Sequence, residues 1–165
     1  MQKRLFFVCP SDCLEPIINN RFRDRNYYYT SLGNSVLFND DTTIQIKRLI
    51  TNNDVEEISF VLSSDNRIVL DALGNQNFSN IEGLNCFYDE IIRQRERSVG
   101  LWQTDNRQFS ILSYYLNQKI KELQLAFNNL LVEPPKVGGK IYDKQKNAFS
   151  NIYSDLICRE EFSLN

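Results

Sequence analysis

The chain has 165 residues, of which 42% are hydrophobic and 24% are charged, and it contains no histidine. A chain of this length can bury about 68–70% of its unfolded surface, so it needs neither a disulfide nor a metal to stabilise a core. The net charge of -2 argues against a dedicated nucleic-acid-binding protein. The lack of histidine removes the commonest general base, the commonest transition-metal ligand and the usual pH switch.

The chain length predicts a single domain over residues 1–165, and we expect a cytoplasmic protein. The apolar run from Leu5 to Cys9 is too short for the core of a signal peptide, and polar residues follow it at once. No stretch approaches the ~20 apolar residues of a membrane span, so we expect no membrane partner. Four cysteines without a secretion signal favour reduced thiols. A high Asn and low Ala content is typical of AT-rich bacterial genomes, so we expect a bacterial source.

Strand and helix patterns alternate in the amino-terminal half of the chain. Three apolar or β-prone runs are predicted strands: 5–9, 26–30 and 57–62. A helix pattern follows each of them, over 14–22, 42–53 and 68–73, with polar or acidic residues just before it. Ser11 or Asp12 is the expected cap of the first helix. Short connections between alternating strands and helices are the signature of a parallel sheet.

The carboxyl-terminal half begins with a helical pattern over 84–92 and a break at 100–102. A long amphipathic helix follows over about 106–131, with an apolar stripe from Phe109 to Leu130. A terminal strand over 140–143, a turn at 144–147 and a return strand over 148–153 complete the prediction. The expected fold class is α/β, with a parallel-dominated sheet flanked by helices. The stripe is longer than one small sheet easily covers, so we expect part of it to contact a second copy in a homodimer.

Polar segments come directly after the predicted strands, from Cys9 to Cys13, from Ser31 to Asn34 and from Ser63 to Asn66. Ligands of open α/β sheets bind outside the carboxyl ends of the strands, and N–H groups at helix starts favour an anion. Helix capping alone also explains these residue types. If a ligand pocket is present, a small anion is its expected ligand. The candidate lining residues are Cys9, Ser11, Asp12, Ser63, Ser64, Asp65 and Asn66.

In this order the three segments resemble the zinc site of the β-class carbonic anhydrases. That family has a first strand ending in Cys-x-Asp-x-Arg, an Asn-Ala-Gly turn, and a later strand ending in His-x-x-Cys. Here Cys9 closes the first strand, Ser31-Leu32-Gly33 stands at the turn, and Ser63-Ser64-Asp65-Asn66 ends the third strand. The segment from Gly139 to Asp143 is similar to the family's Gly-x-x-Tyr-Asp strand. The resemblance implies a β-carbonic-anhydrase-like fold and a dimer.

Departures from the family pattern fall on the zinc ligands. The resemblance places Cys9 at the first ligand position, Ser63 at the histidine and Asn66 at the second cysteine. The family's Asp and Arg fall on Ser11 and Cys13, with Asp12 one residue out of register. A hydroxyl and a carboxamide are poor zinc ligands. The resemblance therefore implies a degenerate, non-catalytic protein with no catalytic residue, no metal and no other cofactor.

An alternative is an enzyme that has kept the pocket and changed its chemistry. Cys9 would then act as a nucleophile or metal ligand on a small substrate, together with Asp12 or Asp65. A following helix N-terminus can stabilise a thiolate. No histidine is available as a base, and the chain lacks the arginine that a Cys-x5-Arg phosphatase loop requires.

Overall fold

The structure, a computed structural model, describes residues 1–99 and 107–153. Its five strands form one sheet in the order β2-β1-β3-β4-β5. The strands are β1 (Lys3–Val8), β2 (Arg25–Thr30), β3 (Glu57–Ser63), β4 (Lys136–Asp143) and β5 (Ala148–Asn151). The first four are parallel, and β5 runs antiparallel to β4. The fold is therefore α/β with a parallel-dominated sheet flanked by helices, as the sequence predicts.

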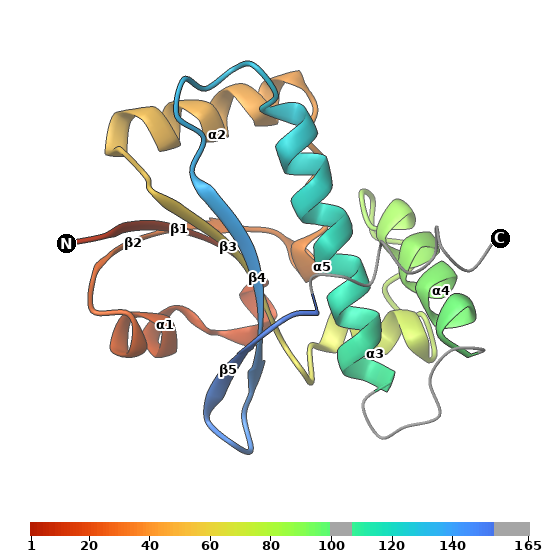
Figure 1. Cartoon of the computed structure of the whole chain (residues 1–165). Coiled ribbons are helices and arrows are strands. Elements are labelled where there is room, and N and C mark those ends of the chain that lie inside the picture. The colour runs from red at the N-terminus through yellow and green to blue at the C-terminus, as the bar shows by residue number, and fades with distance from the viewer. Residues whose placement is uncertain (100–106, 154–165) are drawn as a thin grey trace, which may run out of the picture.

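Helices cover both faces of this sheet. They are α1 (Glu15–Arg21), α2 (Asp40–Asn53), α3 (Arg67–Leu73), α4 (Asn85–Val99) and α5 (Arg107–Ala126), with short 3-10 turns η1 (Pro10–Asp12) and η2 (Leu32–Asn34). Figure 1 shows α1 on one side of the sheet and α2 and α5 on the other. In the described parts of the chain, no helix combines the length and the apolar character needed to cross a bilayer.

The interior strand β1 is buried on both faces because its side chains alternate between two apolar clusters. Leu5 and Phe7 belong to the larger cluster, which also contains residues of α2, α3, α4 and α5. Phe6 and Val8 belong to the smaller cluster, where they pack with Leu14 and residues of α1. The apolar run predicted as a doubly buried strand is confirmed.

The apolar stripe of α5 packs almost entirely within the chain. Its inner members lie in the larger cluster or against it: Phe109, Leu112, Leu116, Ile120, Leu123 and Phe127. Only Leu130, which is 44% exposed, remains open at the end of the stripe. The chain's own sheet and helices thus cover most of this stripe, part of which was expected to contact a second copy.

Several boundaries differ from those predicted, and for three of them the structure shows the reason. Helix α5 ends at Ala126, because a turn closed by the Leu130 N–H and the Phe127 carbonyl follows it. Strand β4 begins as early as Lys136, since it pairs along the whole of β3. The predicted cap of α1 is wrong: its N-cap is Leu14, with no side-chain hydrogen bond. The η1 turn and a left-handed Cys13 (φ 53°) separate Asp12 from that helix. The predicted break at 100–102 lies outside the described residues.

Candidate functional site

Cys9 follows the last residue of β1, and its side chain is fully buried. The backbone N–H of Gly33 donates to its sulfur at 3.1 Å, and the Ser11 Oγ lies 3.0 Å from the same atom. Gly33 has a φ of +59°, and a Cβ at this position would lie 2.9 Å from the Phe87 ring. The glycine of the predicted turn is therefore required both by its backbone conformation and by the closeness of Phe87.

Helix α5 fixes the turn that carries this N–H donor. The Tyr115 hydroxyl donates to the Asn34 carbonyl at 2.8 Å, and the Lys119 Nζ donates to the Val36 carbonyl at 3.0 Å. Both side chains are buried, and burial raises the pKa of Tyr115 well above its usual value. The residues after Gly33 are thus anchored by a helix more than 80 positions later in the chain.

Asp12 is a buried carboxylate, only 6% exposed, that joins two strand ends. One of its oxygens accepts the backbone N–H of Ser63 at 2.8 Å, and the other accepts the side-chain amide of Asn66 at 2.9 Å. Burial raises the pKa of Asp12 above its usual 3.8, and the nearby Asp65 adds to this, although the two hydrogen bonds act in the opposite direction. This carboxylate takes up donors that a bound anion would otherwise use.

Asn66 is the N-cap of α3 and is fully buried. Its side-chain oxygen accepts the N–H groups of Ile68 and Val69 at 3.1 and 3.0 Å, while its amide nitrogen donates to Asp12. Both ends of the carboxamide are therefore occupied within the chain. The capping role expected from the sequence is confirmed for this residue.

Ser63 and Asp65 connect this cluster to the surface. The Ser63 hydroxyl donates to the Asp65 carboxylate, and Lys144 lies 3.3 Å from the other oxygen of that carboxylate. The hydrogen bond from Ser63, followed by the contact with Lys144, lowers the pKa of Asp65. About half of the Asp65 side chain is exposed, so this pair is solvated on one side.

The seven candidate residues thus fall into three groups. Cys9 and Ser11 contact each other, and Asp12 contacts Ser63 and Asn66. Because β1 and β3 are paired neighbours, which lie about 4.8 Å apart, Cys9 and Ser63 stand at adjacent strand ends. Ser64 and Asp65 instead line an open groove on the β4 side. Cys13 is exposed and points its sulfur at the Pro10 carbonyl.

The donor set around Cys9 does not fit a zinc ion. Structural zinc sites need four thiolate, imidazole or carboxylate ligands, and catalytic sites need three. The amide of Asn66 is engaged at both ends, and the Asp12 carboxylate already binds two donors. Within residues 1–99 and 107–153, no group of three or more Cys, Asp or Glu side chains is placed to hold a metal ion.

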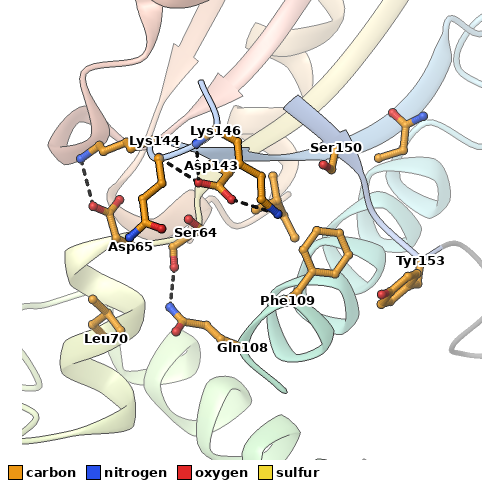
Figure 2. A pocket seen from close by; sticks show the side chains of 13 residues that line it. Ser64, Asp65, Leu70, Gln108, Phe109, Asp143, Lys144, Lys146, Ser150 and Tyr153 are labelled. Carbon is orange, nitrogen blue, oxygen red and sulfur yellow. Dashed lines mark hydrogen bonds and ion pairs between the residues drawn. The ribbon is translucent and has the colours of Figure 1, made fainter. Parts of the chain in front are cut away.

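The groove beside the cluster has a volume of about 810 Å³ and lies at the carboxyl ends of β3 and β4 (Figure 2). We call it the hairpin groove, because the turn between β4 and β5 forms one wall. That wall contributes Asp143, Lys144, Gln145, Lys146 and Ser150, and the start of α5 contributes Gln108 and Phe109. The sequence indicated only a turn at 144–147. Nothing in it signalled that α5 begins opposite this turn.

Comparisons with known proteins place this geometry in a known fold. No protein-family model matches the chain, and a search of curated proteins likewise finds no match. The solved structure of the β-carbonic anhydrase CafD of Aspergillus fumigatus has a TM-score of 0.72 at 17% identity, over 93% of this chain and 90% of that one. Coccomyxa β-carbonic anhydrase has a TM-score of 0.69 at 12% identity, over 99% of this chain and 84% of that one.

A tetrameric β-carbonic anhydrase from Sordaria macrospora is also similar, with a TM-score of 0.65 at 18% identity, over 91% of this chain and 80% of that one. All of these identities lie well below the level at which activity can be carried over from one chain to another. The likeness covers nearly the whole chain and the whole sheet. The chain therefore has the fold of the β-carbonic anhydrases.

Proposed function

We propose that this protein is a catalytically inactive relative of the β-carbonic anhydrases that uses their fold as a cytoplasmic, single-domain, homodimeric scaffold. The observation that carries the proposal is the closed hydrogen-bond network of Asp12, Ser63 and Asn66. The resemblance assigns two of these residues to zinc-ligand positions. Here their polar atoms bind one another and the backbone.

Hydration of carbon dioxide requires the metal to lower the pKa of bound water from 15.7 to about 7. A chain without histidine has no imidazole that could take over proton transfer near neutral pH. The solved structures of this fold are named as carbonic anhydrases, and this chain shares their fold but has neither the His nor the second Cys of the family motif. These two facts together support a role that does not depend on the family's reaction.

Metal analysis and a carbon dioxide hydration assay test this proposal directly. The purified protein is expected to hold no stoichiometric zinc and to leave the buffer rate unchanged. The double variant Ser63→His with Asn66→Cys restores the family's donor types, and we expect it to bind zinc more tightly than a matched Ser64→His variant. One tightly bound zinc per wild-type chain, or hydration above the buffer rate, would contradict the proposal.

Binding of a small anion at the strand ends remains part of the proposal, although the Ser63 N–H already has an acceptor. An anion would have to compete with the Asp12 carboxylate for the Ser63 N–H. Titration with sodium bicarbonate, followed through the amide resonance of Ser63, is the test. We expect weak binding that strengthens in Asp12→Ala, since that variant leaves the N–H without its acceptor. No response in either protein would remove anion binding from the proposal.

The thiol-enzyme alternative requires Cys9 to react with a substrate. Its side chain is fully buried and its sulfur contacts Gly33 and Ser11, whereas Cys13 and Cys86 are exposed. We expect a variant that keeps Cys9 as its sole cysteine to resist a disulfide reagent until it unfolds. Cys158 lies outside the described residues and is replaced in the same variant. Rapid modification of Cys9 in the folded protein would favour the enzyme instead.

A further inference from the structure

We propose that the hairpin groove is a binding site for a neutral polyhydroxylated ligand, such as a sugar or a cyclic polyol. This inference does not rest on the state of the zinc-ligand positions, because the groove walls come from the β4–β5 turn and the start of α5. It shares only Ser64 and Asp65 with the residues predicted from the sequence. The two proposals can therefore fail separately.

The size and position of the groove suit a small ligand. Its volume of about 810 Å³ falls in the range of about 300–1,000 Å³ that ligand sites occupy. It opens at the carboxyl ends of β3 and β4, where ligands of open α/β sheets bind. Figure 2 shows Gln108 and Phe109 of α5 on one side and Lys144 and Lys146 of the turn on the other. A ligand between them would contact two separate elements.

The charges of the groove cancel in pairs. Lys144 lies 3.3 Å from Asp65, and Lys146 lies 3.7 Å from Asp143. Asp143 also accepts the N–H groups of Gln145 and Lys146, so it is fixed in the turn. An anion would meet a carboxylate beside each lysine, and a cation would meet a lysine beside each carboxylate. The groove therefore favours a ligand without net charge.

Neutral donors and acceptors are available alongside these pairs. The Ser64 and Ser150 hydroxyls and the Gln145 side-chain amide make no hydrogen bond in the described parts of the chain, and each can both donate and accept. The Gln108 amide nitrogen donates to the Ser64 carbonyl, and the side-chain oxygen of this lining residue can still accept a hydrogen bond. A ligand bearing several hydroxyl groups matches this mixture, because each hydroxyl also donates and accepts.

An apolar wall completes the site. The rings of Phe109 and Tyr153 meet edge to face with their centres 4.9 Å apart, and Leu70 nearby is 43% exposed. These side chains line the groove together with the polar residues. The C–H face of a sugar ring or of a cyclic polyol can lie on such a surface while its hydroxyls reach the opposite wall. A purely apolar ligand would leave the polar wall unpaired.

The test uses the full chain labelled with nitrogen-15. Glucose, mannose and myo-inositol are titrated separately up to about 50 mM, well above the millimolar Kd expected from a few neutral hydrogen bonds. We expect at least one of them to shift the amide resonances of Ser64, Gln145 and Ser150 in a saturable way. Ethylene glycol, sodium bicarbonate and sodium phosphate serve as comparison probes. They distinguish polyol recognition from general solvation and from anion binding.

Variants at the groove locate the site. Gln145→Ala and Ser150→Ala each remove one exposed neutral group, so we expect either to weaken binding about three- to tenfold. The matched control Gln45→Ala, on an exposed position of α2, is expected to leave the affinity unchanged. The proposal is overturned if no polyol gives a saturable shift, if ethylene glycol acts equally well, if only the anions shift these resonances, or if the control variant weakens binding as much as the groove variants.

Discussion

The Asp12 carboxylate is the acceptor for two buried donors, so its removal leaves both of them unpaired. We expect Asp12→Ala to lower the free energy of unfolding by about 2–4 kcal/mol, since each unpaired buried donor costs about 1–3 kcal/mol. The matched variant Asp65→Ala removes a half-exposed carboxylate and is expected to cost less than about 1 kcal/mol. Urea denaturation measures both. Equal losses would mean that Asp12 does not join the strand ends.

The same side chain makes stability depend on pH. Burial raises the pKa of Asp12 above 3.8 in the folded protein, so the folded state holds this proton more tightly than the unfolded chain does. Its contribution to stability is therefore fully present below pH 3.8 and is lost as the pH rises through the folded pKa.

Comparison with Asp12→Asn isolates this effect, because the amide does not titrate. We expect the stability of the wild type, measured relative to that variant by urea denaturation, to decrease between pH 4 and pH 7. A difference that stays constant over this range, or one that grows with pH, would show that the hydrogen bonds from Ser63 and Asn66 outweigh the burial of the carboxylate.

Two helices begin with the same capping residue in different surroundings. Asn39 caps α2 at the surface by accepting the Thr42 N–H at 2.9 Å. Asn66 caps α3 in the interior and also donates to Asp12. We expect Asn39→Ala to cost about 1 kcal/mol, as caps typically do, and Asn66→Ala to cost at least about 2 kcal/mol because Asp12 also loses a partner. Thermal unfolding of the two variants makes the comparison, and equal costs would argue against the buried network.

Elements formed by strong local patterns could be predicted from the sequence. The apolar run of β1, the capped pattern of α2 and the run of β3 lie within two residues of their predicted bounds. The cap of α1 could not be predicted, because Pro10 starts a separate 3-10 turn and Cys13 adopts a left-handed conformation. The early start of β4 depends on pairing with β3, which local sequence does not encode.

The sequence could predict where the candidate residues lie, but not which of their atoms form hydrogen bonds with one another. Parallel strands bring their carboxyl ends together, so Cys9, Asp12 and Ser63 were expected at one edge of the sheet. Which atoms pair there depends on tertiary distances. The link from Asp12 to Asn66 spans 54 positions, and the link from Tyr115 to the Gly33 turn spans 81. The hairpin groove depends on a contact of the same kind between α5 and the β4–β5 turn.

At the scale of the whole molecule, we expect two copies of the chain to associate. One solved relative is described as tetrameric, and the resemblance implies a dimer. Most of the stripe from Phe109 to Leu130 is packed in the core, and its exposed member is Leu130, which is 44% exposed. Leu125, near the end of α5, is 74% exposed but lies off the stripe, and it serves as a matched control.

We expect light scattering at micromolar concentration to give the mass of two 19.4 kDa chains. A charge placed in an apolar contact between two copies costs several kcal/mol, whereas on an exposed surface it costs almost nothing. Leu130→Asp should therefore shift the protein toward the monomer, and Leu125→Asp should not. A wild-type monomer would remove the homodimer altogether. A dimer that survives Leu130→Asp would place the interface elsewhere than at Leu130, the exposed member of that stripe.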